Sequence, residues 1–211
     1  MLEILQTAPV AVVIFIFTLV TSLYGLYVNQ NLNHQFILHP HSFVRKQRVY
    51  TILTSGLIHA DFGHLLFNML AFYFFAFRLE GILTQTGGNG HLQFALIYIG
   101  GLILSDIPTI IKHRNDPGYA SLGASGAISA VLFSFILFLP TTKLYLFFFP
   151  FVGIPAYILG PLYLVYCVYS SRNQHDRVNH DAHFYGALTG IIFTILLKPG
   201  IIPHFINQLT T

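Results

Sequence analysis

The sequence predicts an all-α membrane protein in which six transmembrane helices form a single bundle. Hydrophobic residues make up 55% of the chain and charged residues only 8%, and the mean hydropathy is +0.67. An ordinary soluble domain carries roughly 25% charged residues. A length of 211 residues leaves no room for a soluble enzyme beside a membrane part, so residues 1–211 are expected to form one domain. Cys167 is the single cysteine, which excludes an intrachain disulfide.

Six apolar segments approach or exceed the roughly 20 residues that a membrane span needs. They cover residues 9–28, 62–79, 92–111, 125–139, 144–169 and 182–197. The first is predicted to be a retained helix and not a signal peptide, because no Lys or Arg precedes it and because it exceeds the roughly 7–15 apolar residues of a signal. The fifth contains Pro150, Pro155 and Pro161. A membrane helix tolerates proline where neighbouring helices satisfy the freed carbonyl groups.

Four polar residues lie near the starts of the even-numbered segments. His64 and Asn68 open the second, Ser125 opens the fourth and His183 opens the sixth. Successive spans alternate in direction, so even-numbered spans all begin on the same side of the membrane. The four side chains are therefore expected at one depth near one surface. Ionisable residues within a membrane span are functional candidates, because burying them in lipid is costly.

Ser125 and His183 are candidates for a nucleophile and its base. A serine hydroxyl is a poor nucleophile until a base within about 2.6–3.2 Å removes its proton. Gly186 and Gly190 form a GxxxG stripe on the helix of His183, which would let that helix pack closely against the helix that begins at Ser125. The predicted chemistry is acyl transfer by a serine hydrolase.

Acyl transfer also needs donors for the developing oxyanion. The first N–H groups of the helix that begins at Ser125 have no intrahelical partner and lie at the positive end of its dipole. His64 and Asn68 are four residues apart, so both side chains can point at one target. Loss of one such donor typically costs about 2.7–4 kcal/mol of transition-state stabilisation.

Three ordered motifs resemble those of the rhomboid family of intramembrane serine proteases. They are HADFGHLLFNM from His59, GASGA from Gly123 and AHFYGALTG from Ala182, and Glu80 is similar to an acidic residue of that family. The resemblance spans residues 54–190, within a motif-bearing core of about 48–197. It implies a six-helix fold and a serine endopeptidase that needs no metal and no cofactor. Its substrates would be transmembrane segments of membrane proteins, cut near a membrane surface at small residues.

By the same resemblance, Ser125 is the nucleophile and His183 the general base, while His64, Asn68 and the backbone N–H of Ser125 form the oxyanion hole. The chain departs from the family at two places. Tyr50-Thr51 replaces a Trp-Arg pair that is frequent in the first loop. Ser129 stands where some relatives place an aromatic ring on the histidine, so the imidazole is expected to be oriented by another residue.

Other interpretations of these residues are weaker. Short GxSG and GxxxG patterns often serve helix packing alone. A zinc site at His59 and His64, or at His180, Asp181 and His183, is disfavoured, since HxxxxH does not face one way on a helix, no HExxH is present and zinc needs three or four convergent ligands. Asp181 should point away from His183 and is expected to cap its helix.

Two further functions stay open beside the protease. One is a catalytically inactive rhomboid-like protein that binds membrane clients, and the other is a small transporter or channel, which the lack of a visible repeat disfavours. The net charge of +3 is small and scattered, so the expected partners are the lipid bilayer and membrane proteins, with no nucleic acid and no metal.

The chain is expected to be multi-pass in a bacterial plasma membrane, because no presequence is evident. The family topology, with both termini in the cytoplasm, conflicts with the loop charges. It places outside the residues Arg45, Lys46, Arg48, Lys112, Arg114, Arg172 and Arg177, and inside only Arg78, Lys143 and Lys198. Basic residues normally gather on the inner side.

Overall fold

The computed structural model describes residues 6–146, 149–173 and 178–210, and it is mostly helical. Its helices are α2 (Pro9–Tyr27), α3 (Gln30–Phe36), α4 (Pro40–Phe43), α5 (Thr51–Thr54), η1 (Ser55–Leu57, a 3-10 helix), α6 (Phe62–Gln85), α7 (Gly90–Lys112), α8 (Ser125–Phe138), α9 (Ala156–Asn173), α10 (His180–Leu197) and α11 (Ile201–Thr210). A two-stranded sheet, β1 (Lys143–Leu146) and β2 (Phe149–Pro155), lies between α8 and α9. The predicted all-α polytopic membrane class is confirmed.

Three helices, α2, α6 and α7, are long and apolar enough to cross a membrane. The α10–α11 pair, bent by 106°, adds a fourth if the two are one span. Helix α8 is apolar but has only 14 residues, which is about 21 Å and shorter than the roughly 30 Å hydrocarbon layer. The total of six spans therefore stays a prediction, although a helix occurs in every segment where one was expected.

The fifth predicted segment, residues 144–169, is corrected by the structure. Its first part is the antiparallel hairpin β1–β2, in which Lys143 pairs with Pro155 and Tyr145 with Gly153. The segment becomes helical only at α9. Proline in a helix interior removes a backbone donor and clashes with the preceding turn, whereas Val, Ile and aromatic residues favour strands. Pro161, by contrast, lies inside α9 as predicted.

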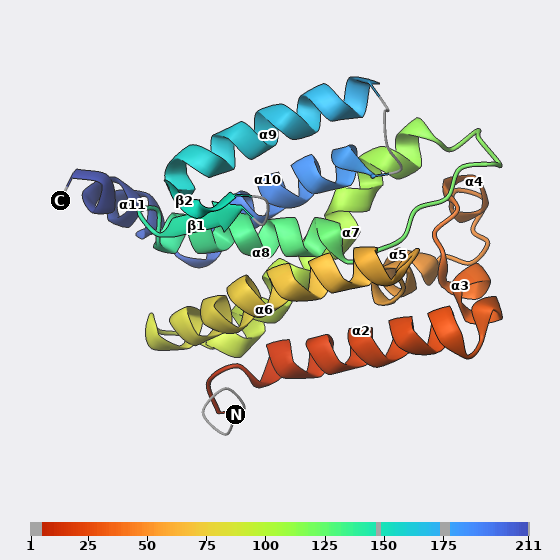
Figure 1. Ribbon diagram of the computed structural model, residues 1–211, viewed down its shortest axis with the longest axis horizontal. Helices are drawn as coiled ribbons and strands as arrows, with labels where there is room; N and C mark the ends of the chain where they lie inside the picture. Colours follow the sequence, from red (N-terminus) through yellow and green to blue (C-terminus); the bar gives the residue numbers. More distant parts are fainter. Residues whose placement is uncertain (1–5, 147–148, 174–177, 211) are drawn as a thin grey trace.

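Helix α8 is the central element of the bundle. Every residue from Gly126 to Phe138 except Leu132 is buried. Figure 1 shows α8 between α6 and α10, with α2 and α9 along opposite edges of the molecule. Helices α3–α5 lie at the end where α6, α8 and α10 begin, while the hairpin and α11 lie at the other end. The predicted common end for the three motif-bearing helices is therefore confirmed.

Small residues bring the backbones of α8 and α10 into contact. A Cβ atom on Gly186 would lie 2.9 Å from the carbonyl carbon of Gly126, and one on Gly190 would lie 2.7 Å from that of Ala130. Only glycine fits at such a close approach, as in other small-residue helix interfaces of membrane proteins. The predicted close packing of the Gly186–Gly190 stripe against α8 is confirmed.

Glu80 anchors the first helix to the bundle. Its fully buried carboxylate accepts hydrogen bonds from Val10 N at 3.1 Å and Ala11 N at 2.7 Å, and it lies 2.6 Å from His91 Nδ1. The first N–H groups of a helix have no partner of their own, and a negative charge there also favours the dipole. Glu80, the acidic residue that resembles one of the rhomboid family, thus fixes α2 against α6.

Candidate active site

Ser125 is the first residue of α8 and follows a sharp turn. Gly123 has φ of +112°, a conformation that favours glycine, and its N–H donates to Ser55 O at 2.9 Å. The N-cap residue Ala124 makes no side-chain capping bond. The first-turn N–H groups of α8 are thus not taken by a capping side chain and lie beside the Ser125 hydroxyl.

His64 and Asn68 lie against that turn. Asp61 caps α6 by accepting from His64 N at 2.8 Å, which fixes the first turn of the helix. A Cβ atom on Gly123 would lie 2.9 Å from His64 Nε2 and 3.8 Å from Asn68 Nδ2. Both predicted donors are therefore brought to the turn that precedes Ser125.

The amide of Asn68 is a buried donor. Asn68 is only 8% exposed, and its Nδ2 has no hydrogen-bond partner among the residues that the structure describes. An unsatisfied buried donor costs about 1–3 kcal/mol. Such a group is suited to an acceptor that arrives with a substrate.

The ring of His59 packs against the ring of His64. Its Nδ1 lies 2.8 Å from Ser22 Oγ, and the hydroxyl proton of Ser22 goes to Leu57 O at 2.8 Å, so Nδ1 of His59 is the donor of the pair. Burial, reinforced by His64 and opposed by Asp61, lowers the pKa of His59 to about 3. The neutral ring meets the ring of His64 edge-on, with centroids 4.9 Å apart. The sequence marked His59 as the first residue of a motif and as a disfavoured metal ligand, and this positioning contact was not predicted.

His183 lies in the first turn of α10 and is half-buried. The ring of Tyr163 from α9 stacks on it, with centroids 6.3 Å apart and planes within 17°. The hydroxyl of Tyr163 also lies 3.2 Å from Ser129 Oγ on α8. Tyr163 therefore supplies the aromatic contact that Ser129 cannot, and it ties α9 to both helices. No motif marked Tyr163, because the contact joins helices that are distant in sequence.

The first turns of α8 and α10 pack directly together. Gly126, next to Ser125, faces Gly186, which lies one turn after His183. A Cβ atom on Gly126 would also lie 3.4 Å from the carbonyl oxygen of Ala182. The immediate neighbours of the nucleophile and of the base are thus in contact.

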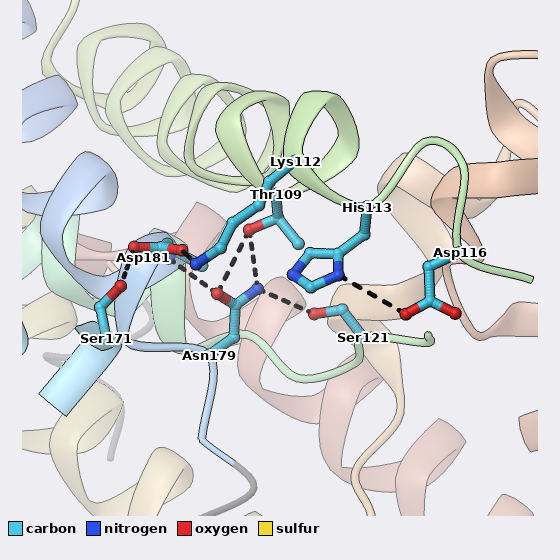
Figure 2. A network of polar contacts seen from close by, with 9 residues as sticks. Thr109, Lys112, His113, Asp116, Ser121, Ser171, Asn179 and Asp181 are labelled. Carbon is cyan, nitrogen blue, oxygen red and sulfur yellow. Dashed lines mark hydrogen bonds and ion pairs between the residues drawn. The ribbon is translucent and has the colours of Figure 1, made fainter. Parts of the chain in front are cut away.

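A polar network holds the start of α10 (Figure 2). Asn179 caps the helix by accepting from Ala182 N at 3.0 Å, and its amide donates to Thr109 Oγ1 at 3.0 Å and to Ser121 Oγ at 3.1 Å. These bonds join α10 to α7 and to the loop that leads to Ser125. The network fixes the helix turn that carries His183.

Asp181 does not cap α10, and that prediction was wrong. It is the second residue of the helix, so Asn179, which precedes the helix, takes the capping position. Asp181 instead pairs with Lys112 Nζ of α7 at 2.7 Å and accepts from Ser171 Oγ of α9 (Figure 2). It thereby ties α7, α9 and α10 together.

An apolar cavity of about 390 Å³ lies between α8, α9 and the hairpin. Tyr163 forms part of its wall, with Phe75 of α6 and Leu132 of α8. Tyr163 therefore borders the cavity and also stacks on His183. Apolar chain segments or side chains fit a space of this character.

A family model and three similar proteins all point to one family. The model of the rhomboid domain matches residues 46–200. The "Putative rhomboid protease YdcA" of Bacillus subtilis is 32% identical over 147 residues, which are 70% of this chain and 66% of that protein. "RHOMBOID-like protein 12, mitochondrial" of Arabidopsis thaliana is 26% identical over 194 residues, 84% of this chain and 55% of that protein.

A third relative is "Rhomboid protein 1, mitochondrial" of Saccharomyces cerevisiae, 27% identical over 147 residues, 68% of this chain and 40% of that protein. The chain thus spans 40% to 66% of the length of these relatives. The family match covers well over half of the chain and includes Ser125, His183, His64 and Asn68. This chain belongs to the rhomboid family of membrane proteins.

Proposed function

We propose that this protein is an intramembrane serine endopeptidase that cleaves transmembrane segments of other membrane proteins with a Ser125–His183 dyad. The observation that carries the proposal is the backbone contact between Gly126 and Gly186, which sets the first turns of α8 and α10 side by side. A nucleophile and its base must meet within a hydrogen bond, and this packing supports such a meeting.

In the proposed reaction, Ser125 Oγ attacks a peptide carbonyl while His183 takes its proton. His183 then gives the proton to the leaving amine, and a water molecule releases the acyl group by the same steps in reverse. The oxyanion would be bound by the backbone N–H of Ser125 and by the side chains of His64 and Asn68. The buried, unpartnered Asn68 amide supports this role, because it gains a hydrogen bond only when an acceptor arrives.

The substrate is proposed to reach the dyad from the lipid, past α9. The outer face of α9 is apolar and exposed at Ile158, Val165 and Tyr169, as expected for a helix at a lipid boundary. The apolar cavity beside Tyr163 lies on the inner face of α9 and would hold apolar side chains of a bound segment.

We place the protein in a bacterial plasma membrane. The Bacillus subtilis relative supports this location, whereas two relatives carry a mitochondrial name. Fractionation of the source cells distinguishes a plasma membrane from an organelle.

The test is covalent labelling of the full chain in detergent micelles with a fluorophosphonate, beside cleavage of a model transmembrane substrate. Ser125→Ala and His183→Ala should both eliminate labelling and cleavage, while Ser170→Ala and His34→Ala, at positions outside the site, retain both. Unfolding curves establish that each variant is folded. Folded wild-type protein without Ser125-dependent labelling would identify the inactive, client-binding alternative.

A further inference from the structure

We propose that Cys167, His180 and His183 form a Zn²⁺ site whose occupation removes the general base, so that zinc reversibly inhibits the protein. The inhibitory part rests on the proposed protease function, whereas metal binding itself does not. One ligand atom from each of the three residues lies within 4.8 Å of the other two. No other part of the described chain brings three such ligands together.

The ligand set matches what zinc binds. Zinc takes thiolate at about 2.3 Å and imidazole nitrogen at about 2.0–2.1 Å in a tetrahedral arrangement, which sets ligand atoms roughly 3.3–3.6 Å apart. The 4.8 Å limit exceeds this spacing by about 1.2–1.5 Å, which small side-chain rotations would close. Three protein ligands leave a fourth position for water, as in open zinc sites.

Two helices supply the ligands from fixed positions. His180 and His183 are three residues apart on α10 and share one face, and Cys167 lies opposite them on α9. Tyr166 meets the ring of His180 edge-on, with centroids 5.4 Å apart, and Tyr163 stacks on His183. These rings and the Asn179 network limit the movement of the ligands before metal arrives.

A separate cavity borders Cys167, one of the three ligands. It has a volume of about 170 Å³ and is lined by Cys167, Ser171, Arg172, Asp181 and Phe184 among others. The thiol of Cys167 is buried, so this cavity is its route to the outside. Asp181 contributes negative charge to the wall and Arg172 contributes positive charge; Lys112 pairs with Asp181 at 2.7 Å.

Coordination and base catalysis exclude each other at His183. A neutral imidazole has one nitrogen with a free lone pair, while the other nitrogen carries a proton. If zinc takes the lone pair, neither nitrogen can accept the proton of Ser125. Binding also displaces the thiol proton of Cys167 to solvent, so zinc affinity should rise with pH.

The sequence predicted no metal, because neither His59 with His64 nor His180, Asp181 and His183 offered three or four convergent ligands. The pair His180 and His183 lacked a convergent third group there, and Asp181, which was considered for that place, binds Lys112 and Ser171 instead. Cys167 supplies the third ligand only once α9 packs against α10.

The first experiment measures metal binding without reference to activity. The metal-free full chain in detergent is titrated with Co²⁺, and the thiolate-to-cobalt absorption band is followed, with Zn²⁺ as competitor. Wild-type protein should give a band that Zn²⁺ abolishes, and Cys167→Ala should give none. Since even outer-shell changes weaken metal binding about 10–100-fold, loss of a direct ligand should weaken it at least about 100-fold. Absence of a band in folded wild-type protein overturns the proposal.

The second experiment follows fluorophosphonate labelling of Ser125 at rising concentrations of free Zn²⁺. Labelling of wild-type protein should fall and should recover on chelation, while Cys167→Ala labels equally without zinc and stays labelled. His34→Ala, the matched control for a distant histidine, should remain as sensitive as wild type. Cys167→Ser replaces the alanine variant if that variant unfolds.

The two hypotheses fail in different ways. Equal zinc sensitivity of wild type and Cys167→Ala overturns the zinc site and leaves the protease intact. A cobalt band without any Ser125 labelling supports the metal site and removes the proposed protease function.

Discussion

The contact between α8 and α10 predicts a large effect of one methyl group. In Gly186→Ala, the new Cβ lies 2.9 Å from the carbonyl carbon and 3.0 Å from Cα of Gly126. Carbon atoms pack best at about 3.5–4.0 Å, so the overlap is about 0.5–1.1 Å. Both partners are helix backbone and cannot rotate away. The helices must therefore separate by about 1 Å at the crossing nearest to Ser125 and His183.

This separation should reduce activity more than stability. Overpacking of this kind costs about 1–3 kcal/mol of unfolding free energy, whereas a misplacement of about 1 Å between reacting groups can cost about 100-fold in rate. The assay compares the rate of fluorophosphonate labelling with the denaturation midpoint of the same sample in detergent. Gly186→Ala should remain folded at low temperature and label about 100-fold more slowly than wild type.

Gly81→Ala on α6 is the matched control, because no heavy atom lies within 4 Å of its Cβ position. It should label normally and be more stable by up to about 1 kcal/mol, since alanine favours helix over glycine. If Gly186→Ala labels within about twofold of wild type, the reasoning that joins this crossing to the dyad is refuted, because a 1 Å shift would then have no catalytic cost.

Three further predictions concern the residues that support the site. The free energy of unfolding in detergent should be highest above pH 6.5 and should fall by about 1.4 kcal/mol per pH unit toward pH 3. The reason is that the native pKa of His59 is lowered to about 3, while the unfolded value stays near 6.5. His59→Gln should flatten this slope. Tyr163→Phe should lose about 0.5–1.5 kcal/mol of stability with its Ser129 bond but keep its labelling rate and pH profile, whereas Tyr163→Ala should slow labelling and shift that profile. Glu80→Gln should lower the free energy of unfolding by about 1.5–3 kcal/mol, since two backbone donors of α2 lose a charged acceptor. The loss is measured as a lower denaturation midpoint, and an unchanged midpoint would show that α2 is held by apolar packing alone.

Residues with a strong local signal were predictable from the sequence. Apolar runs predicted the bounds of the helices that carry Ser125 and His183 to within a few residues. Small residues at i and i+4 predicted which faces of these two helices would pack together. The alternation of membrane spans then placed His64 and Asn68 at the same end as Ser125. Each of these inferences uses a periodicity that the chain itself carries.

The remaining features depend on contacts between distant segments. Tyr163 and Cys167 are ordinary members of an apolar run, and only the packing of α9 on α10 gives them a role. The hairpin was missed because the same Phe- and Val-rich residues suit either a buried helix or a strand. Pro150 and Pro155 disfavour the helix, since proline removes a backbone donor and clashes with the preceding turn. Asn179 was missed as the cap because Asp181 is an equally good capping residue by type, although it lies two positions too late.

The hairpin β1–β2 fixes where the membrane ends. Its outer edges carry backbone groups that only water or headgroups can satisfy, so a two-stranded ribbon cannot sit in hydrocarbon. Phe151, 96% exposed on that ribbon, is suited to anchor it in the boundary layer beside the lipid headgroups. If α8 runs along the membrane normal, its roughly 21 Å leave about 9 Å of a roughly 30 Å hydrocarbon layer between Ser125 and the opposite boundary. At that depth a peptide bond must leave the lipid to be cut.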